Sequence, residues 1–170
     1  MEIKRYGAKE FLAAGKLCIR ENEIHIWCIC WPEMTDFWVN HEYILGGQES
    51  EQVGRFRFSE DRMRYIAGKV VVRLLLKRYL DVETIDFSVS ERGKPYHKKI
   101  AGKQTVDFNI SHSGEFILAG FAVGMDIGVD VQEMAGCPDY WEIAGNFYTD
   151  EDAADVIKEG SDLFFQYWQD

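Results

Sequence analysis

The helical pattern from Ser59 to about Leu80 is the longest in this 170-residue sequence, and it constrains the fold more than any other feature. Ser59 can cap such a helix, and the acidic residues Glu60 and Asp61 fall in its first turn, where the helix dipole favours negative charge. Apolar residues at helical spacing form one stripe that has to be buried. The residues expected in this stripe are Met63, Ile66, Ala67, Val70 and Leu74.

Short β segments are predicted on both sides of this helix. The run from Ile24 to Trp31 alternates and is rich in isoleucine and tryptophan, so it is expected to be a strand with Cys28 and Cys30 as small core residues. Residues 32–54 look irregular, with a short helix. Downstream, strands are predicted at residues 85–90, 105–111, 116–123 and 127–131, and helices at roughly 139–147, 150–158 and 161–170. This order of elements predicts an α+β fold.

The composition limits the classes of function. The net charge of −10 argues against general nucleic-acid binding, and no apolar run approaches the roughly 20 residues that span a bilayer. The four cysteines fit neither zinc spacing nor a disulfide framework, and residues 1–20 do not resemble a secretory signal, so a cytoplasmic location is expected.

The charge is unevenly distributed along the chain. Residues 55–100 carry twelve basic and six acidic side chains, whereas residues 101–170 carry two basic and fourteen acidic ones. A basic region that binds an anionic ligand, beside an acidic region that binds a cation, would explain this pattern. Two solvated surfaces would explain it equally well, since charge runs are often only surface.

The run from Asp126 to Gln132 has an alternation that suits a metal site. Its β-branched residues would face the core, and Asp126, Asp130 and Gln132 would share the other face. Residues two apart in a strand are about 7 Å apart, so an ion or its bound waters can touch both Asp130 and Gln132. Mg²⁺ prefers such oxygen ligands. Taken alone, the run is also consistent with a wet edge strand.

Two further runs contain groups that bind phosphate. In Asn109–Gly114, the adjacent Ser111 and His112 would point to opposite faces of a strand, which argues against a serine hydrolase and leaves both free to surround phosphate oxygens. In Arg92–Tyr96, a glycine permits close backbone approach and Lys94 supplies a positive charge. Each run by itself is also consistent with a plain turn.

Together and in this order, these runs resemble one family. Phe87–Pro95, Phe108–Gly114 and Ile127–Val131 closely resemble the 4′-phosphopantetheinyl transferases of the surfactin-synthetase-activating type. The predicted helix matches too, through Glu60-Asp61, Arg64 and Gly68. Further on, Phe147 through Glu151 resembles the F-x-x-x-E element of the family. The resemblance covers about residues 23–170.

The resemblance implies a fold and a reaction. The expected architecture is one complete half of a pseudo-two-fold αβ fold at residues 23–124, an incomplete second half at 125–170, and an N-terminal extension at 1–22. The family transfers 4′-phosphopantetheine from coenzyme A to a serine of an acyl or peptidyl carrier protein and releases 3′,5′-ADP. Mg²⁺ bridges the pyrophosphate in this reaction.

The resemblance also implies roles for individual residues. Asp130 is expected to ligate the metal and to be catalytic, with Glu151 close to the same site and Gln132 as a further metal ligand. Phosphate groups of coenzyme A are expected to contact Lys94, Ser111, His112 and, at the 3′-phosphate, Arg64. Gly93 and Pro95 are expected to lie against the adenine.

The sequence departs from the family at three places. Gln132 stands where relatives often have a second carboxylate, and Glu49 and Gln52 stand where relatives often have phosphate-binding lysines. After Trp168 the family continues into a K-E-(A/S)-x-x-K element that this sequence does not contain. We therefore expect a truncated transferase that is weak or inactive and that self-associates through the apolar segment Leu163–Trp168. The alternative is a non-catalytic protein of the same fold that binds coenzyme A or a carrier protein.

Overall fold

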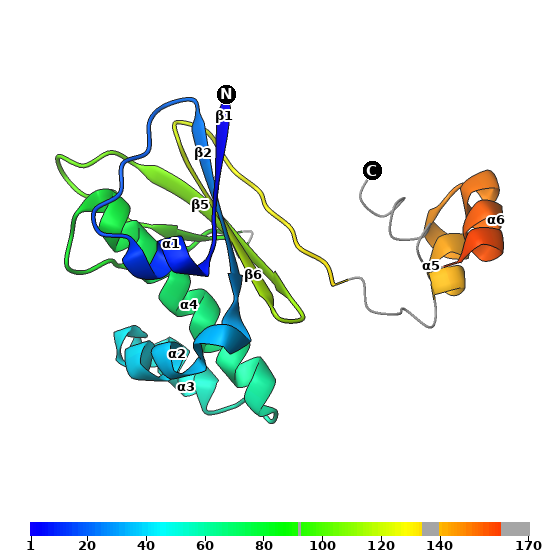
Figure 1. Cartoon of the computed structure of the whole chain (residues 1–170), viewed down its shortest axis with the longest axis horizontal. Coiled ribbons are helices and arrows are strands. Elements are labelled where there is room, and N and C mark those ends of the chain that lie inside the picture. The colour runs from blue at the N-terminus through cyan, green and yellow to red at the C-terminus, as the bar shows by residue number, and fades with distance from the viewer. Residues whose placement is uncertain (92, 134–139, 161–170) are drawn as a thin grey trace. The chain divides into compact units, whose positions relative to one another are not determined.

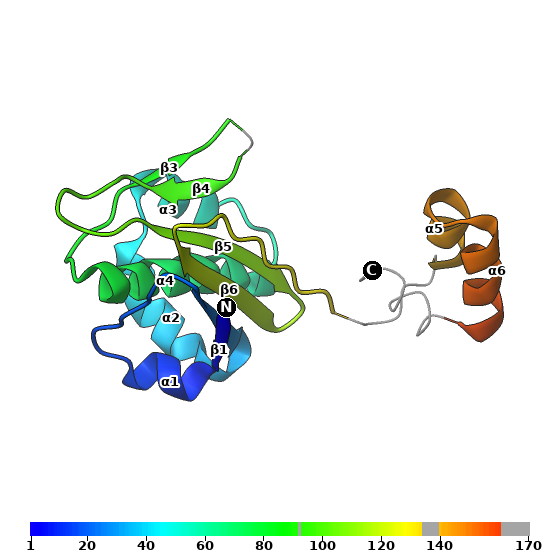
Figure 2. The same ribbon diagram turned by 90° about the horizontal axis from the view of Figure 1, so that it is seen from above.

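The computed structural model describes residues 1–91, 93–133 and 140–160 of the chain. These residues belong to two compact units, residues 1–131 and residues 132–170, which are described separately below. Figure 1 and Figure 2 show the elements of both units from two directions.

The first unit is built on a mixed four-stranded sheet. Its strands are β1 (Glu2–Tyr6), β2 (Glu23–Cys30), β5 (Val106–Ser113) and β6 (Phe116–Val123), in the order β1-β2-β6-β5. The β1–β2 pair is parallel, and the β2–β6 and β6–β5 pairs are antiparallel. A separate hairpin joins β3 (Phe87–Val89) and β4 (Pro95–His97). The strands predicted at 24–31, 105–111 and 116–123 are confirmed, and the one at 85–90 is shorter than predicted.

The prediction of a strand at residues 127–131 is wrong. These residues join no backbone ladder among the described residues. Their amides are bound by side chains of β5 instead.

Helices cover one face of the sheet. α1 (Ala8–Ala13) lies between β1 and β2 in the chain, and α4 (Ser59–Leu80) has the predicted bounds. Between β2 and α4 the chain forms four short helices: η1 (Trp31–Met34), α2 (Thr35–His41), η2 (Glu42–Ile44) and α3 (Gly47–Val53). The prediction that Ser59 caps α4 is wrong, because the N-cap is Phe58 and it has no side-chain cap hydrogen bond.

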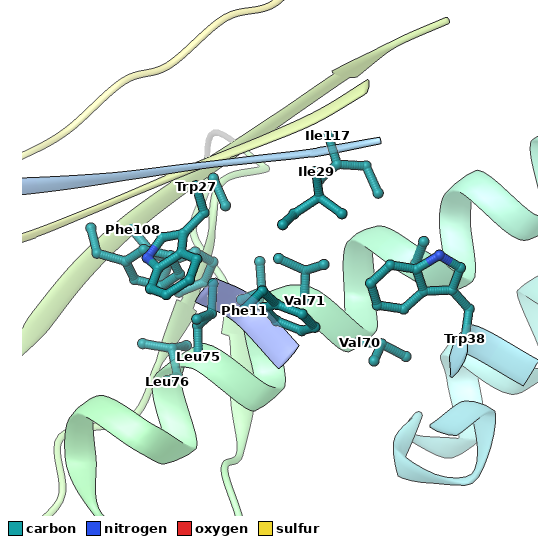
Figure 3. Packing of buried hydrophobic residues seen from close by; sticks show 14 of the residues in the cluster. Phe11, Trp27, Ile29, Trp38, Val70, Val71, Leu75, Leu76, Phe108 and Ile117 are labelled. Carbon is teal, nitrogen blue, oxygen red and sulfur yellow. The ribbon is translucent and has the colours of Figure 1, made fainter. Parts of the chain in front are cut away.

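The main core lies between the sheet and α4. Figure 3 shows side chains from the strands meeting side chains of α4, with Phe11 and Trp38 completing the layer. The burial of α4 is wider than the predicted stripe: Met63 and Leu74 are only partly buried, whereas Val71, Val72, Leu75, Leu76 and Tyr79 are buried. The predicted stripe covers too few residues, because α4 packs against α2 and α3 as well as against the sheet.

The N-terminal segment, expected as an extension, contributes to this core. Its strand β1 pairs with β2, its Phe11 is fully buried, and the Tyr6 ring stacks on Trp27 with centroids 4.4 Å apart. Contact with β2 therefore makes residues 1–22 part of the first unit. The division into pseudo-symmetric halves at residue 124 stays a prediction.

The expectation that Cys28 and Cys30 are core residues is wrong. Cys28 is exposed and Cys30 is only half-buried, because the face of β2 that meets the core carries Trp27 and Ile29. Partial burial of Cys30 raises the pKa of its thiol.

The second unit contains the predicted helix pair α5 (Tyr140–Phe147) and α6 (Asp150–Glu159). Its small core is formed by Ala144, Ala153 and Val156. Thr149 caps α6, and its hydroxyl accepts a hydrogen bond from the Asp152 amide. The predicted helix at 161–170, which contains the apolar segment expected to self-associate, and Cys137 lie outside the described residues. In the part of the chain that the structure describes, no helix combines the length and the apolar character that crossing a membrane requires.

A buried polar chain links α4 to β2 and β1. Trp27 Nε1 donates to the Tyr79 hydroxyl at 3.0 Å, and this hydroxyl lies 2.8 Å from His25 Nδ1. His25 Nε2 is 3.4 Å from Glu23, which accepts a hydrogen bond from Lys4 at 2.8 Å. Burial lowers the pKa of His25, and the bond from Lys4 lowers the pKa of Glu23 to about 2. The folded state therefore favours the neutral form of His25.

The fold should lose stability in mild acid because of His25. Its pKa is lower in the folded than in the unfolded chain, where it is about 6.5, so the unfolded chain binds more protons as the pH falls below that value. Glu23 loses its contribution only as the pH falls from its usual value of 4.5 toward 2. We expect urea unfolding to give a lower free energy at about pH 5.5 than at about pH 7.5. In a His25→Gln variant this difference should shrink, and an undiminished difference would assign it to other groups.

Candidate functional site

A cavity of about 880 Å³ lies at the free edge of β5. Elements α3, α4, β3 and β5 contribute to its walls, so it is formed entirely within the first unit. The lining side chains that matter most for its chemistry are Glu49, Tyr65, Lys69, Arg73, Phe87, Pro95, Ser111 and His112.

The cavity lies where α4 approaches β5 closely. A Cβ atom at Gly68 would lie 3.4 Å from Ile110 Cδ1, at the short limit of ordinary van der Waals contact. Gly68 and Ile110 both line the cavity. On the wall formed by α4, burial raises the pKa of the Tyr65 hydroxyl.

Ser111 and His112 lie on opposite faces of β5, as the sequence predicts. In the ladder with β6, Ser111 is opposite Leu118 and His112 is opposite Ile117. The Ser111 hydroxyl donates to Asp130 Oδ1 at 2.7 Å, whereas His112 is exposed. Since Ser111 gives its proton to a carboxylate and not to the neighbouring imidazole, the geometry does not support a serine hydrolase.

The segment that carries Asp130 is attached to β5 by side-chain hydrogen bonds. The Val129 amide donates to Asn109 Oδ1 at 2.9 Å, and the Val131 amide donates to Ser111 Oγ at 3.3 Å. Burial alternates as predicted: Ile127 is buried, Val129 and Val131 are half-buried, and Asp130 is exposed. These bonds hold the Asp130 carboxylate beside Ser111.

The β3–β4 hairpin lies beside this segment. Gly93 has φ +81°, which side-chain-bearing residues rarely adopt, and its amide donates to Ser90 O in the turn. Lys94 Nζ donates to the backbone oxygen of Ile127 at 3.1 Å. Pro95 begins β4 and lines the cavity, whereas Gly93 and Lys94 are not among the lining residues.

Arg64 links α4 to the β5–β6 turn. Its Nε donates to Gly114 O at 2.9 Å and its Nη1 pairs with Asp61 at 2.9 Å. It does not line the cavity. The structure thus brings Pro95, Ser111 and His112 to the cavity, while Arg64 bonds elsewhere, as Lys94 does.

The residues expected at the metal are divided between the two units. Asp130 belongs to the first, and Gln132 and Glu151 belong to the second, so their assembly into one site stays a prediction. Glu151 is exposed in the first turn of α6, and Gln132 Nε2 donates to Glu133 O at 3.4 Å. Among the described residues, no group of three His, Cys, Asp or Glu side chains converges. The exposed Asp130 carboxylate fits Mg²⁺, which is commonly held by one or two carboxylates together with substrate phosphates.

Comparison with known proteins identifies the family. The family model for the N-terminal part of 4′-phosphopantetheinyl transferases matches residues 30–122, which is more than half of the chain. The chain belongs to the 4′-phosphopantetheinyl transferase family. The resemblance that the sequence motifs indicate is therefore confirmed, and so is the α+β fold.

Three relatives illustrate the extent of the match. HetI, a 4′-phosphopantetheinyl transferase of Nostoc, is 27% identical over 89% of this chain and 67% of its own length. The 4′-phosphopantetheinyl transferase Sfp of Bacillus subtilis is 33% identical over 73% of this chain and 55% of its own. A putative 4′-phosphopantetheinyl transferase of Synechocystis is 28% identical over 75% of this chain and 54% of its own. The chain thus spans between about half and two thirds of these relatives.

Two features of the candidate site were not identified from the sequence. Asn109 fixes the Asp130 segment, and the signal for it was its position two residues before Ser111, on the same face of a strand. Lys69 and Arg73 line the cavity and were not among the expected site residues. Their spacing of four residues placed them on one helix face.

The attachment of the Asp130 segment should depend on the absence of a side chain at Gly120. A Cβ atom there would lie 2.6 Å from Val129 Cγ1 and 2.8 Å from Ile127 Cδ1. We expect Gly120→Ala to push residues 127–131 off the sheet, at a cost of about 1–3 kcal/mol. Hydrogen exchange at the Val129 and Val131 amides should become faster.

The matched control is Gly128→Ala, because nothing lies within 4 Å of a Cβ atom at that position. In this variant, hydrogen exchange at the Val129 and Val131 amides should be as slow as in the parent chain. Equal exchange in the Gly120→Ala variant and the parent chain would contradict the packing described here.

Proposed function

We propose that this chain binds coenzyme A in the cavity beside β5 and takes part in the Mg²⁺-dependent transfer of 4′-phosphopantetheine to a serine of a carrier protein, with release of 3′,5′-ADP. The observation that carries the proposal is the 2.7 Å bond between Ser111 and Asp130. It joins a side chain of the cavity wall to the carboxylate that corresponds to the metal ligand of the family. Phosphate binding and metal binding would then occur side by side.

Different residues of the chain would bind the phosphates, the adenine and the metal. Ser111 and His112 offer hydrogen-bond donors to phosphate oxygens, and Pro95 offers an apolar surface to the adenine. Asp130 would hold Mg²⁺, which neutralises charge on the pyrophosphate when it is bound. Lys94 would have to leave Ile127 O to reach a phosphate, so its proposed role requires a movement of its side chain.

A non-catalytic protein that binds coenzyme A or a carrier is the second candidate. One observation favours it. Gln132, an uncharged residue, replaces one carboxylate of the family. A site with few negative ligands holds Mg²⁺ weakly, because this ion gives up its water reluctantly.

Asp130 should couple Mg²⁺ to coenzyme A binding. We expect Mg²⁺ to tighten coenzyme A binding by roughly tenfold in the parent chain, because Asp130 would hold the metal and the metal would neutralise charge on the pyrophosphate. The Asp130→Asn variant should lose this gain while it keeps its affinity in the presence of a chelator. Calorimetric titration with and without Mg²⁺ measures both values.

Asp126→Asn is the control for this measurement. Asp126 is exposed in the same extended segment but forms no bond to Ser111. Its loss of charge should leave the Mg²⁺ effect unchanged. An equal loss in both variants would mean that Mg²⁺ responds to general charge and not to a site at Asp130.

The 170 residues alone should transfer phosphopantetheine slowly or not at all. Asp130 is the one family metal ligand that the first unit carries, and Gln132 brings no negative charge to the metal, so Mg²⁺ should be held weakly. We expect calorimetry to detect coenzyme A binding and mass spectrometry to find little or no mass gain on an apo carrier protein. Rapid and complete modification would refute the expectation of weak activity and would exclude the non-catalytic candidate.

A further inference from the structure

The cavity contains an ion cluster that the proposed function does not use. Lys69 and Arg73 lie one helical turn apart on α4, and both pair with the same carboxylate, that of Glu49 on α3. All three side chains line the cavity and are partly or largely buried, with exposed fractions of 35%, 12% and 19%, respectively.

Both carboxylate oxygens of Glu49 are engaged by neighbouring groups. Its Oε1 is 3.5 Å from Lys69 Nζ, and its Oε2 pairs with Arg73 and accepts the Gly46 amide at 3.1 Å. The Arg73 guanidinium also lies over the Phe87 ring, 4.5 Å from its centroid. Backbone and side-chain contacts thus fix the carboxylate and the two cations together.

The charges that line the cavity cancel. In the parts of the chain that the structure describes, the cavity-lining cations are Lys69 and Arg73, and the lining carboxylates are Glu49 and Asp86. Two cations at this spacing form a binding site for a phosphate group, and the Glu49 carboxylate occupies it. An incoming phosphate has to displace that carboxylate or stay away from the pair.

We propose that Glu49 is a specificity-determining residue that blocks an anion subsite at Lys69 and Arg73, so that the cavity gains little from a terminal phosphomonoester on its ligand. The inference rests on the proposed function, in which the ligand is coenzyme A. Coenzyme A carries one such group, its 3′-phosphate, which dephospho-coenzyme A lacks. A terminal phosphate carries more charge than a carboxylate, so it is the group whose binding Glu49 opposes most.

Removal of the Glu49 charge should create selectivity for the terminal phosphate. In the parent chain we expect calorimetry to give affinities for coenzyme A and dephospho-coenzyme A that agree within about threefold. In Glu49→Gln, which can still accept the Gly46 amide, coenzyme A should bind about tenfold more tightly, with little change for dephospho-coenzyme A. A gain that is equal for both ligands, or a loss for coenzyme A, would overturn the proposal.

Three further variants separate this role from a structural one. Glu51→Gln removes an exposed charge of α3 that pairs with Arg55 outside the cavity, so the two affinities should not change. Arg73→Gln added to Glu49→Gln should abolish the new selectivity. If Glu49→Gln fails to fold, Glu49→Asp, which withdraws the carboxylate by one methylene, should show part of the same selectivity, and none would overturn the proposal.

Failure of the proposed function would give a different result. If neither the parent nor Glu49→Gln binds coenzyme A or dephospho-coenzyme A, the coenzyme A assignment fails. The subsite is then tested by comparing the affinities of each variant for adenosine 3′,5′-bisphosphate and adenosine 5′-monophosphate. A gain of Glu49→Gln for the bisphosphate alone supports the role of Glu49, and no gain overturns it.

Discussion

The burial of α4 between the sheet and the α2–α3 layer determines where the polar side chains of the site lie. Because the helix is apolar on several sides, only a narrow strip of it remains for charged residues at the β5 edge. Lys69 and Arg73 lie on that strip and line the cavity. The packing of α4 therefore fixes the position of the cation pair.

The second support of the site is polar. Asp130 lies on a segment without strand pairing, and two amides of that segment are bound by Asn109 and Ser111 of β5. Gly120 leaves the space that Val129 and Ile127 fill on the sheet. Side-chain hydrogen bonds of this kind can be exchanged for bonds to a ligand more easily than a backbone ladder can, because each engages a single pair of groups.

Much of the fold follows from patterns that extend over many residues. The bounds of α4 and of strands β2, β5 and β6 were largely predictable because each is an apolar run that ends near glycine or polar residues, and β2 also alternates cleanly in burial. The side-chain attachment of residues 127–131 was not, because alternation reports which side chains are buried and not what binds the amides. Nor was β1, since Glu2, Lys4 and Arg5 make its sequence look like solvent-exposed chain.

The same distinction applies to the site. The motifs led to Pro95, Ser111 and His112 at the cavity, because each motif includes part of a strand whose residues line it. The pairing of Glu49 with Lys69 and Arg73 joins residues from two helices, and no local pattern reports such a contact. Arg64 illustrates the converse, since it matches a family position and yet binds Gly114 O in this structure.

Ser111 makes the phosphate and metal parts of the proposed site depend on each other. Its hydroxyl has a single proton, which it donates to Asp130, so it cannot at the same time donate to a phosphate. If a cation competes with this hydroxyl for Asp130 Oδ1, the proton becomes available to a phosphate beside it. Two ligands whose binding releases the same hydrogen bond favour each other's binding, and by linkage the effect is reciprocal. In the proposed site, Asp130 and Ser111 would thus hold Mg²⁺ and a pyrophosphate together better than either alone.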